Sequence, residues 1–185
     1  MKKRWWIVVI PILLYLLISW YYPYSWWSMH QTYDYEADPV FARDYKNKIE
    51  NFKKSYTINP KDKLTTETTG MAVEDLFTEK WLVTDNPVSV EYAYLDKIKN
   101  DVQSIRQNFT HLDRKGPEYT PHAQNQLYLL IDTLESIEKE VDDIKDMRNG
   151  LMRSDADNVL NNLHVSVAAS ADMLIEFYGA HQNGE

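Results

Sequence analysis

Apolar residues recur at alternating intervals of three and four over residues 86–178, and polar residues fill most of the positions between them. Three series of positions with this spacing are present, over residues 88–112, 127–151 and 156–177. The first two series contain eight positions each, and seven of the eight residues are apolar in each series. Because this spacing places side chains on one face of a helix, the pattern predicts three long amphipathic helices in succession.

Residues that start or end helices separate these three segments. The predicted starts are Asn86-Pro87, Thr120-Pro121 and Ser154, and the predicted ends are Gly116-Pro117 and Asn149-Gly150. Since the connections are short, consecutive helices should run antiparallel. A regular alternation of three and four also favours left-handed supercoiling. We therefore expect an all-α, elongated, coiled-coil-like antiparallel three-helix bundle over residues 85–179.

Three polar residues fall on the apolar seam of these helices: Glu91, Arg148 and Ser170. In one interpretation, Arg148 extends to solvent from the end of the bundle and Ser170 lets two helices approach closely. In the other, a polar side chain in the seam fixes the register or the choice of partner, as buried polar residues do in coiled coils. The three residues are therefore candidate register- or partner-specifying positions.

Residues 38–84 predict a helix, a linker and a short capping helix. Asp38-Pro39 marks a helix start, and apolar residues follow at three- and four-residue spacing up to residue 56. This helix either continues away from the membrane or packs on the bundle as a fourth helix. Residues 57–70 have the composition of a linker. Residues 71–84 predict a short helix whose apolar face covers one end of the bundle.

The N-terminal region contains an 18-residue run without charge, residues 5–22. As a helix this run would be about 27 Å long, close to the roughly 30 Å hydrocarbon core of a bilayer. Aromatic residues flank it, as they do at membrane interfaces: Trp5, Trp6, Trp20, Tyr21, Tyr22, Trp26 and Trp27. No suitable cleavage site follows, so we expect an uncleaved signal-anchor, a single transmembrane helix ahead of the bundle.

The basic residues predict the orientation of this span. Three of the 20 basic residues precede it, and the next one is Arg43. Positive charge favours the cytoplasmic side, so residues 1–4 should form a cytoplasmic stub and the bulk of the chain should be extracytoplasmic, at the cell membrane. Residues 23–37 predict an aromatic juxtamembrane collar, with a peptide- or glycan-binding platform as the alternative. We expect residues 180–185 to form a tail.

Composition excludes several functional classes. The net charge is −8, and the chain beyond the apolar run is more acidic still because the first three basic residues precede that run. An acidic surface argues against nucleic acid as a partner, since phosphate binding needs a basic face. The absence of cysteine excludes disulfides, thiolate metal sites and cysteine nucleophiles.

No pattern of catalytic or metal-binding residues is present. None of the five histidines follows a glutamate by three residues and no two are spaced four apart, so the di-iron and zinc-protease patterns are both missing. The five glycines are too scattered for a phosphate-binding loop. His111 and His122 flank a predicted turn, either as solvated residues or as a metal or pH-sensing pair. We expect no catalytic residue, no cofactor and no metal, and hence no enzyme.

These features together predict a non-enzymatic, membrane-anchored extracytoplasmic helical scaffold or adaptor. Its partner would be another cell-envelope protein, or a second copy of the chain through self-association. The alternative is an extracytoplasmic sensory or small-ligand-binding helical module. Because only four residues precede the predicted span, such a module would have to act through a membrane partner.

Overall fold

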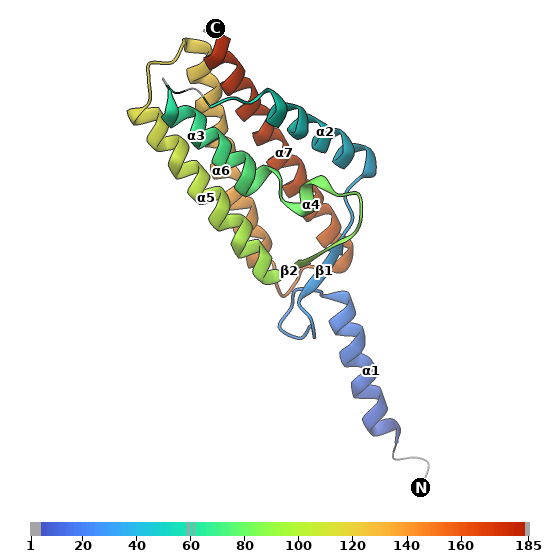
Figure 1. Cartoon of the computed structure of the whole chain (residues 1–185). Coiled ribbons are helices and arrows are strands. Elements are labelled where there is room, and N and C mark those ends of the chain that lie inside the picture. Colours follow the sequence, from blue (N-terminus) through green and yellow to red (C-terminus); the bar gives the residue numbers. More distant parts are fainter. Residues whose placement is uncertain (1–4, 59, 61, 184–185) are drawn as a thin grey trace.

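The protein is an elongated helical body from which one N-terminal helix projects (Figure 1). The computed structural model describes residues 5–58, 60 and 62–183, so the predicted stub at residues 1–4 and the end of the predicted tail lie outside it. The described part is mostly helical, which confirms the all-α prediction, but it also contains a small two-stranded sheet.

The three long helices of the bundle are α5 (Tyr92–Lys115), α6 (Pro121–Asp146) and α7 (Arg153–Asn183). They lie side by side, and consecutive helices run in opposite directions (Figure 1). The Thr120 hydroxyl caps α6 by accepting a hydrogen bond of 3.2 Å from the backbone N–H of Ala123, and Pro121 follows it as predicted. The buried faces carry the apolar seam: Leu95, Ile98, Val102, Ile105, Phe109, Leu112, Leu127, Leu130, Leu134, Ile137, Val141, Ile144, Leu160, Leu163, Val167, Leu174 and Phe177.

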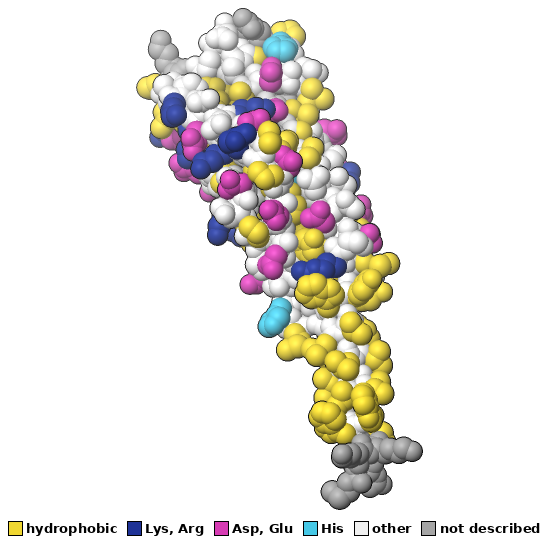
Figure 2. Space-filling model, turned by 90° about the vertical axis from the view of Figure 1, so that its right-hand side faces the viewer, with side chains coloured by type: hydrophobic (Ala, Val, Ile, Leu, Met, Phe, Trp, Pro, Cys, Tyr) yellow, Lys and Arg dark blue, Asp and Glu magenta, His cyan; other side chains and the backbone are white. Residues whose placement is uncertain are grey.

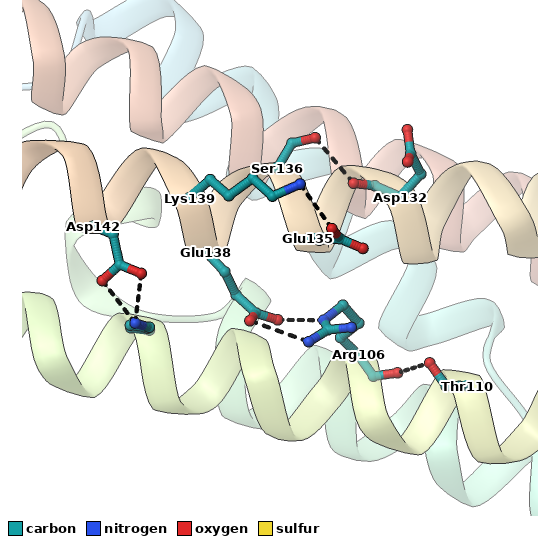
Figure 3. A network of polar contacts seen from close by, with 9 residues as sticks. Arg106, Thr110, Asp132, Glu135, Ser136, Glu138, Lys139 and Asp142 are labelled. Atoms are coloured by element: carbon teal, nitrogen blue, oxygen red, sulfur yellow. Dashed lines mark hydrogen bonds and ion pairs between the residues drawn. The ribbon is translucent and has the colours of Figure 1, made fainter.

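Ion pairs join α5 to α6 beside this seam (Figure 3). The Arg106 guanidinium donates two hydrogen bonds to the carboxylate of Glu138, whose side chain is only 12% exposed. Farther along, the Lys99 ammonium lies 2.7 and 2.6 Å from the two carboxylate oxygens of Asp142. A bidentate arginine–carboxylate pair has one preferred geometry, so the first pair favours one alignment of the two helices.

The two strands are β1 (Thr32–Tyr35) and β2 (Val88–Glu91), which pair antiparallel with Thr32 opposite Glu91. The prediction that Asn86-Pro87 starts a helix is therefore wrong, because α5 begins only at Tyr92. Residues 88–91 gain backbone hydrogen bonds from β1, and Val90 on this strand is fully buried. The sheet places part of the predicted collar against the end of the bundle.

The segment between the strands folds onto the bundle. It contains α2 (Pro39–Ser55), α3 (Lys63–Ala72), the π-helix η1 (Val73–Phe77) and α4 (Lys80–Val83). Asp38 caps α2 by accepting hydrogen bonds from the N–H groups of Val40 (3.0 Å) and Phe41 (2.8 Å), so the predicted start is confirmed. Helix α2 packs against α7 and α4 and is thus a fourth helix of the body.

The predicted linker at residues 57–70 is wrong for its second half. Helix α3 occupies residues 63–72 and packs on α5. The Asp62 carboxylate caps it by accepting a hydrogen bond of 3.2 Å from the N–H of Thr65. Threonine has a low helix propensity, but burial against α5 outweighs this preference, since Thr65, Thr66, Thr68 and Thr69 are all buried.

The N-terminal helix α1 (Trp6–Tyr21) is shorter than the predicted span. Its 16 residues correspond to about 24 Å, and Pro23 restricts Tyr22 to a non-helical backbone. Within residues 5–58, 60 and 62–183, no helix combines the length and the apolar character needed to cross a membrane. The predictions of a transmembrane signal-anchor and of a single-pass membrane location are therefore wrong.

We expect Leu130→Ala to lower the free energy of unfolding by about 2–5 kcal/mol, because the truncated side chain leaves a cavity in the seam. Leu130 is fully buried, whereas its neighbour Leu129 is 42% exposed. Leu129→Ala is therefore the matched control and should cost less than about 1 kcal/mol. Urea unfolding of both variants measures the difference, and equal losses would contradict the assigned seam.

Candidate interaction site

Helix α1 is the largest exposed apolar feature of the described residues. None of its residues is buried, and its apolar side chains are exposed on every side of the helix. The exposed fraction is 60% for Trp6 at its first residue and 56% for Tyr21 at its last. Figure 2 shows apolar side chains covering the projecting helix, whereas charged side chains are spread over the body. Globular proteins rarely expose apolar surface on this scale except where they bind something.

Arg148 fixes the turn at the base of α1 to the bundle. It lies in the turn between α6 and α7, where its Nε donates a hydrogen bond of 2.9 Å to the carbonyl oxygen of Tyr24. Its Nη2 donates to the side-chain oxygen of Gln31. The guanidinium carbon also lies 3.8 Å from the ring centroid of Trp26 and 4.0 Å from that of Tyr92. One cation thus holds residues 24, 26 and 31 in place.

The backbone at Gln31 supports the same junction. Gln31 has a positive φ of 49°, a conformation that costs energy for a residue with a side chain. Its carbonyl oxygen accepts a hydrogen bond of 2.8 Å from the N–H of Tyr92, the first residue of α5. Together with the Arg148 contact, this bond keeps the unfavourable conformation in place and directs the chain into β1.

A second arginine lies on the other side of the junction. The guanidinium carbon of Arg153, at the start of α7, is 4.1 Å from the ring centroid of Trp20 in α1 and 5.3 Å from that of Tyr33 in β1. Cation–π contacts of this kind contribute about 0.5–1 kcal/mol at exposed sites. Arg153 therefore links the last turn of α1 to the body.

His164 lies at the centre of the body, surrounded by aromatic rings from three other elements. Its own ring centroid is 5.2 Å from that of Phe41, 5.4 Å from Trp81, 5.9 Å from Tyr35 and 6.2 Å from Tyr45. Nδ1 shares a hydrogen bond of 2.9 Å with the Tyr35 hydroxyl, whereas Nε2 is buried with no hydrogen-bond partner in the described protein.

Burial lowers the pKa of His164 to about 4, and a weaker interaction with the backbone of Leu82 raises it. The imidazole is therefore neutral at pH 7. Burial likewise raises the pKa values of the Tyr35 and Tyr45 hydroxyls, so these groups stay protonated as hydrogen-bond donors. The Tyr45 hydroxyl donates a hydrogen bond of 2.9 Å to the carbonyl oxygen of Phe77. With its groups neutral and mostly paired, the cluster holds α2, α4, β1 and α7 together.

The three candidate register-specifying residues occupy different environments. Glu91 is exposed at the end of β2, and Arg148 is in a turn, so neither lies on a helical seam. Ser170 is fully buried in α7, where its hydroxyl donates a hydrogen bond of 2.8 Å to the carbonyl oxygen of Val167. A role for any of them in register or partner choice stays a prediction.

The seven aromatic residues predicted at a membrane interface lie in or next to α1. Six are exposed and Tyr22 is half-buried. Two of them make cation–π contacts with arginines of the body: Trp20 contacts Arg153, and Trp26 contacts Arg148. Their assignment to a membrane interface depended on the transmembrane span, which the structure does not support.

Sequence reasoning missed His164 and the junction contacts of Arg148. His164 follows Leu160 by four residues and precedes Val167 by three, so the helical period placed it next to the buried stripe. Its aromatic neighbours come from residues 35–81, and no local pattern indicates that pairing. In the part of the chain that the structure describes, no cluster of three acidic or histidine side chains is suited to a metal ion.

Comparisons with known protein families, with curated proteins and with solved structures find no match to this chain.

We expect His164→Gln to flatten the dependence of stability on pH between about 6.5 and 4. An unfolded histidine binds a proton below about pH 6.5, whereas folded His164 binds one only below about 4. The unfolding free energy of the native protein should therefore be highest above pH 6.5 and fall as the pH is lowered to 4, by up to about 1.4 kcal/mol per pH unit from this group.

Urea unfolding across this pH range measures the slope for each protein. The control is His111→Gln, which replaces an exposed histidine on α5. A slope in His164→Gln as steep as that of the native protein would show that His164 does not carry the effect.

We expect Arg148→Lys to loosen the junction without unfolding the bundle. Lysine keeps the charge but lacks the planar fork that reaches the Tyr24 carbonyl and Gln31 together. The free energy of local opening over residues 24–35 should fall by about 1.5–3 kcal/mol, as expected for hydrogen bonds from a charged group. Hydrogen exchange of those amides measures it, with the exposed Arg114→Lys as the control. Unchanged protection in Arg148→Lys would contradict the assigned role.

Proposed function

We propose that this protein is a non-enzymatic helical adaptor that binds another protein through α1. The observation that supports this proposal most directly is the exposure of α1, an uncharged helix with no buried residue and no other described element covering it. A helix of 16 residues is marginally stable alone in water, and its stability in proteins comes mostly from tertiary packing. A binding partner would supply that packing.

The distribution of apolar side chains on α1 indicates the kind of partner. A helix that packs on one surface has an apolar stripe and a polar face, whereas α1 is apolar all round. A single flat patch would leave most of α1 in water. The partner therefore encloses α1 between two or more uncharged, apolar helices, as a protein core encloses a buried helix.

The body of the protein acts as the scaffold in this proposal. Its seam, the aromatic cluster around His164 and the arginine contacts at the junction form one continuous packed unit. Because Arg148 and Arg153 anchor the base of α1, the helix leaves the body in a defined direction. A partner that binds α1 is thus positioned relative to the acidic surface of the bundle.

We expect Leu14→Glu to abolish the complex while leaving the bundle folded. Leu14 is 53% exposed in the middle of α1, so a carboxylate there costs nothing in the free protein. In the complex the carboxylate would be enclosed by apolar helices without a counter-charge, which should weaken binding by at least about tenfold. Leu129→Glu is the control, because Leu129 is 42% exposed on α6, outside α1.

The measurement is purification of the tagged full-length protein and both variants from cells that produce it naturally, followed by size analysis and mass spectrometry. The native protein and Leu129→Glu should retain a partner at fixed stoichiometry, with crosslinks to α1, and Leu14→Glu should lose it. A complex containing only copies of this chain would identify self-association in place of an adaptor. Retention of the partner by Leu14→Glu would refute docking through α1.

A further inference from the structure

A cavity of about 320 Å³ lies at the base of α1, between its last turn, the following turn and the start of α7. One part of its wall is apolar and includes Leu16, Trp20 and Met29. Another part is polar and includes Ser19, Ser28 and Arg153. Binding sites for small molecules commonly combine an apolar wall with a few polar groups, and their volumes start near 300 Å³.

Arg153 supplies the guanidinium that lines this cavity, and within the described chain its hydrogen-bond donors are available. Arg106 and Arg148, by contrast, use their donors within the protein: Arg106 donates to Glu138, and Arg148 donates to Tyr24 and Gln31. Arg153 only stacks on the rings of Trp20 and Tyr33, and within the described chain its guanidinium makes no hydrogen bond or ion pair. A guanidinium has five N–H donors in a planar fork that matches a carboxylate.

The two serines add donors to the same cavity. The Ser19 hydroxyl oxygen accepts a hydrogen bond of 3.1 Å from the N–H of Met29, and the Ser28 oxygen accepts one of 3.3 Å from the N–H of Gln31. Their own hydroxyl hydrogens have no acceptor within the described chain. Because a hydroxyl can donate while it accepts, both serines can bind a further acceptor in the cavity.

Asp34 limits the charge of a ligand. Its carboxylate also lines the cavity, but it does not form an ion pair with Arg153. Asp34 repels each negative charge on a ligand and offsets the single positive charge of Arg153, so a head group with one negative charge is favoured over one with two. The apolar wall suits an alkyl chain. A water molecule occupies about 30 Å³ in the liquid. If each non-hydrogen atom of a ligand needs a similar volume, the cavity has room for roughly ten of them.

We propose that this cavity binds an unbranched monocarboxylate of medium chain length. The carboxylate accepts hydrogen bonds from the Arg153 fork and from the hydroxyls of Ser19 and Ser28. The chain lies along Leu16, Trp20 and Met29. The cavity uses Leu16, Ser19 and Trp20 at the base of α1 but needs no protein partner, so either proposal can fail without the other.

Titration calorimetry of the full chain with octanoate, which has ten non-hydrogen atoms, tests the proposal. Octanoate should bind with a stoichiometry of one. Arg153→Gln should weaken its affinity by at least tenfold, whereas Arg153→Lys should weaken it less because the charge remains. Arg43→Gln, on the exposed side of α2, is the matched control and should bind octanoate as the native protein does.

Octanol and acetate separate the contributions of head group and chain. Both should bind at least tenfold more weakly than octanoate. If octanol binds as tightly as octanoate, the chain merely adheres to exposed apolar surface and the proposal is wrong. If acetate binds as tightly, the site recognises only the anion and the apolar wall has no role. Unchanged octanoate affinity in Arg153→Gln would also overturn the proposal, provided that urea unfolding shows the variant to be folded.

Discussion

Burial of the apolar seam between α5, α6 and α7 is the interaction on which the rest of the structure depends. The seam residues from Leu95 to Phe177 are almost completely removed from water, and burial of each large aliphatic side chain contributes about 1.5–3 kcal/mol. The shortest elements are not stable alone, because β1, β2 and α4 have four residues each. They fold because the bundle offers them a surface.

The aromatic cluster around His164 is a second contact, beside the packing of α3 on α5, between that surface and the N-terminal half of the body. It joins one residue of α7 to rings from β1, α2 and α4, which are spread over residues 35–81. A histidine is well suited to this position because its ring packs edge-on against other rings while Nδ1 still pairs with the Tyr35 hydroxyl. The low pKa follows from this burial, so the cluster stays uncharged in neutral solution.

The helices of the bundle could be predicted because their signals are local. The apolar period and the Thr120 cap are both within a few residues of the helices that they define. The sheet could not be predicted, since Thr32 pairs with Glu91 and nothing near either residue indicates the other. Asn86-Pro87 resembles a helix start, and only the pairing of residues 88–91 with β1 decides against it. Arg148 falls on the seam only if the helical period continues two residues past Asp146, where α6 ends.

The candidate sites also combine features that the local sequence predicts with contacts between segments that are distant in the sequence. The apolar character of α1 is evident from composition, but its length is not, because that depends on where Pro23 ends the helix. The cavity at its base needs four segments in their folded positions: α1, the turn held by Arg148, β1, and the first residue of α7. Arg148 and Arg153 are five residues apart and have different roles. Arg148 uses its donors to build the junction, whereas the donors of Arg153 have no acceptor among the described residues and lie beside the cavity. The same junction therefore sets the direction of α1 and shapes the cavity, so a ligand bound there would contact the root of the helix that we propose as the docking element.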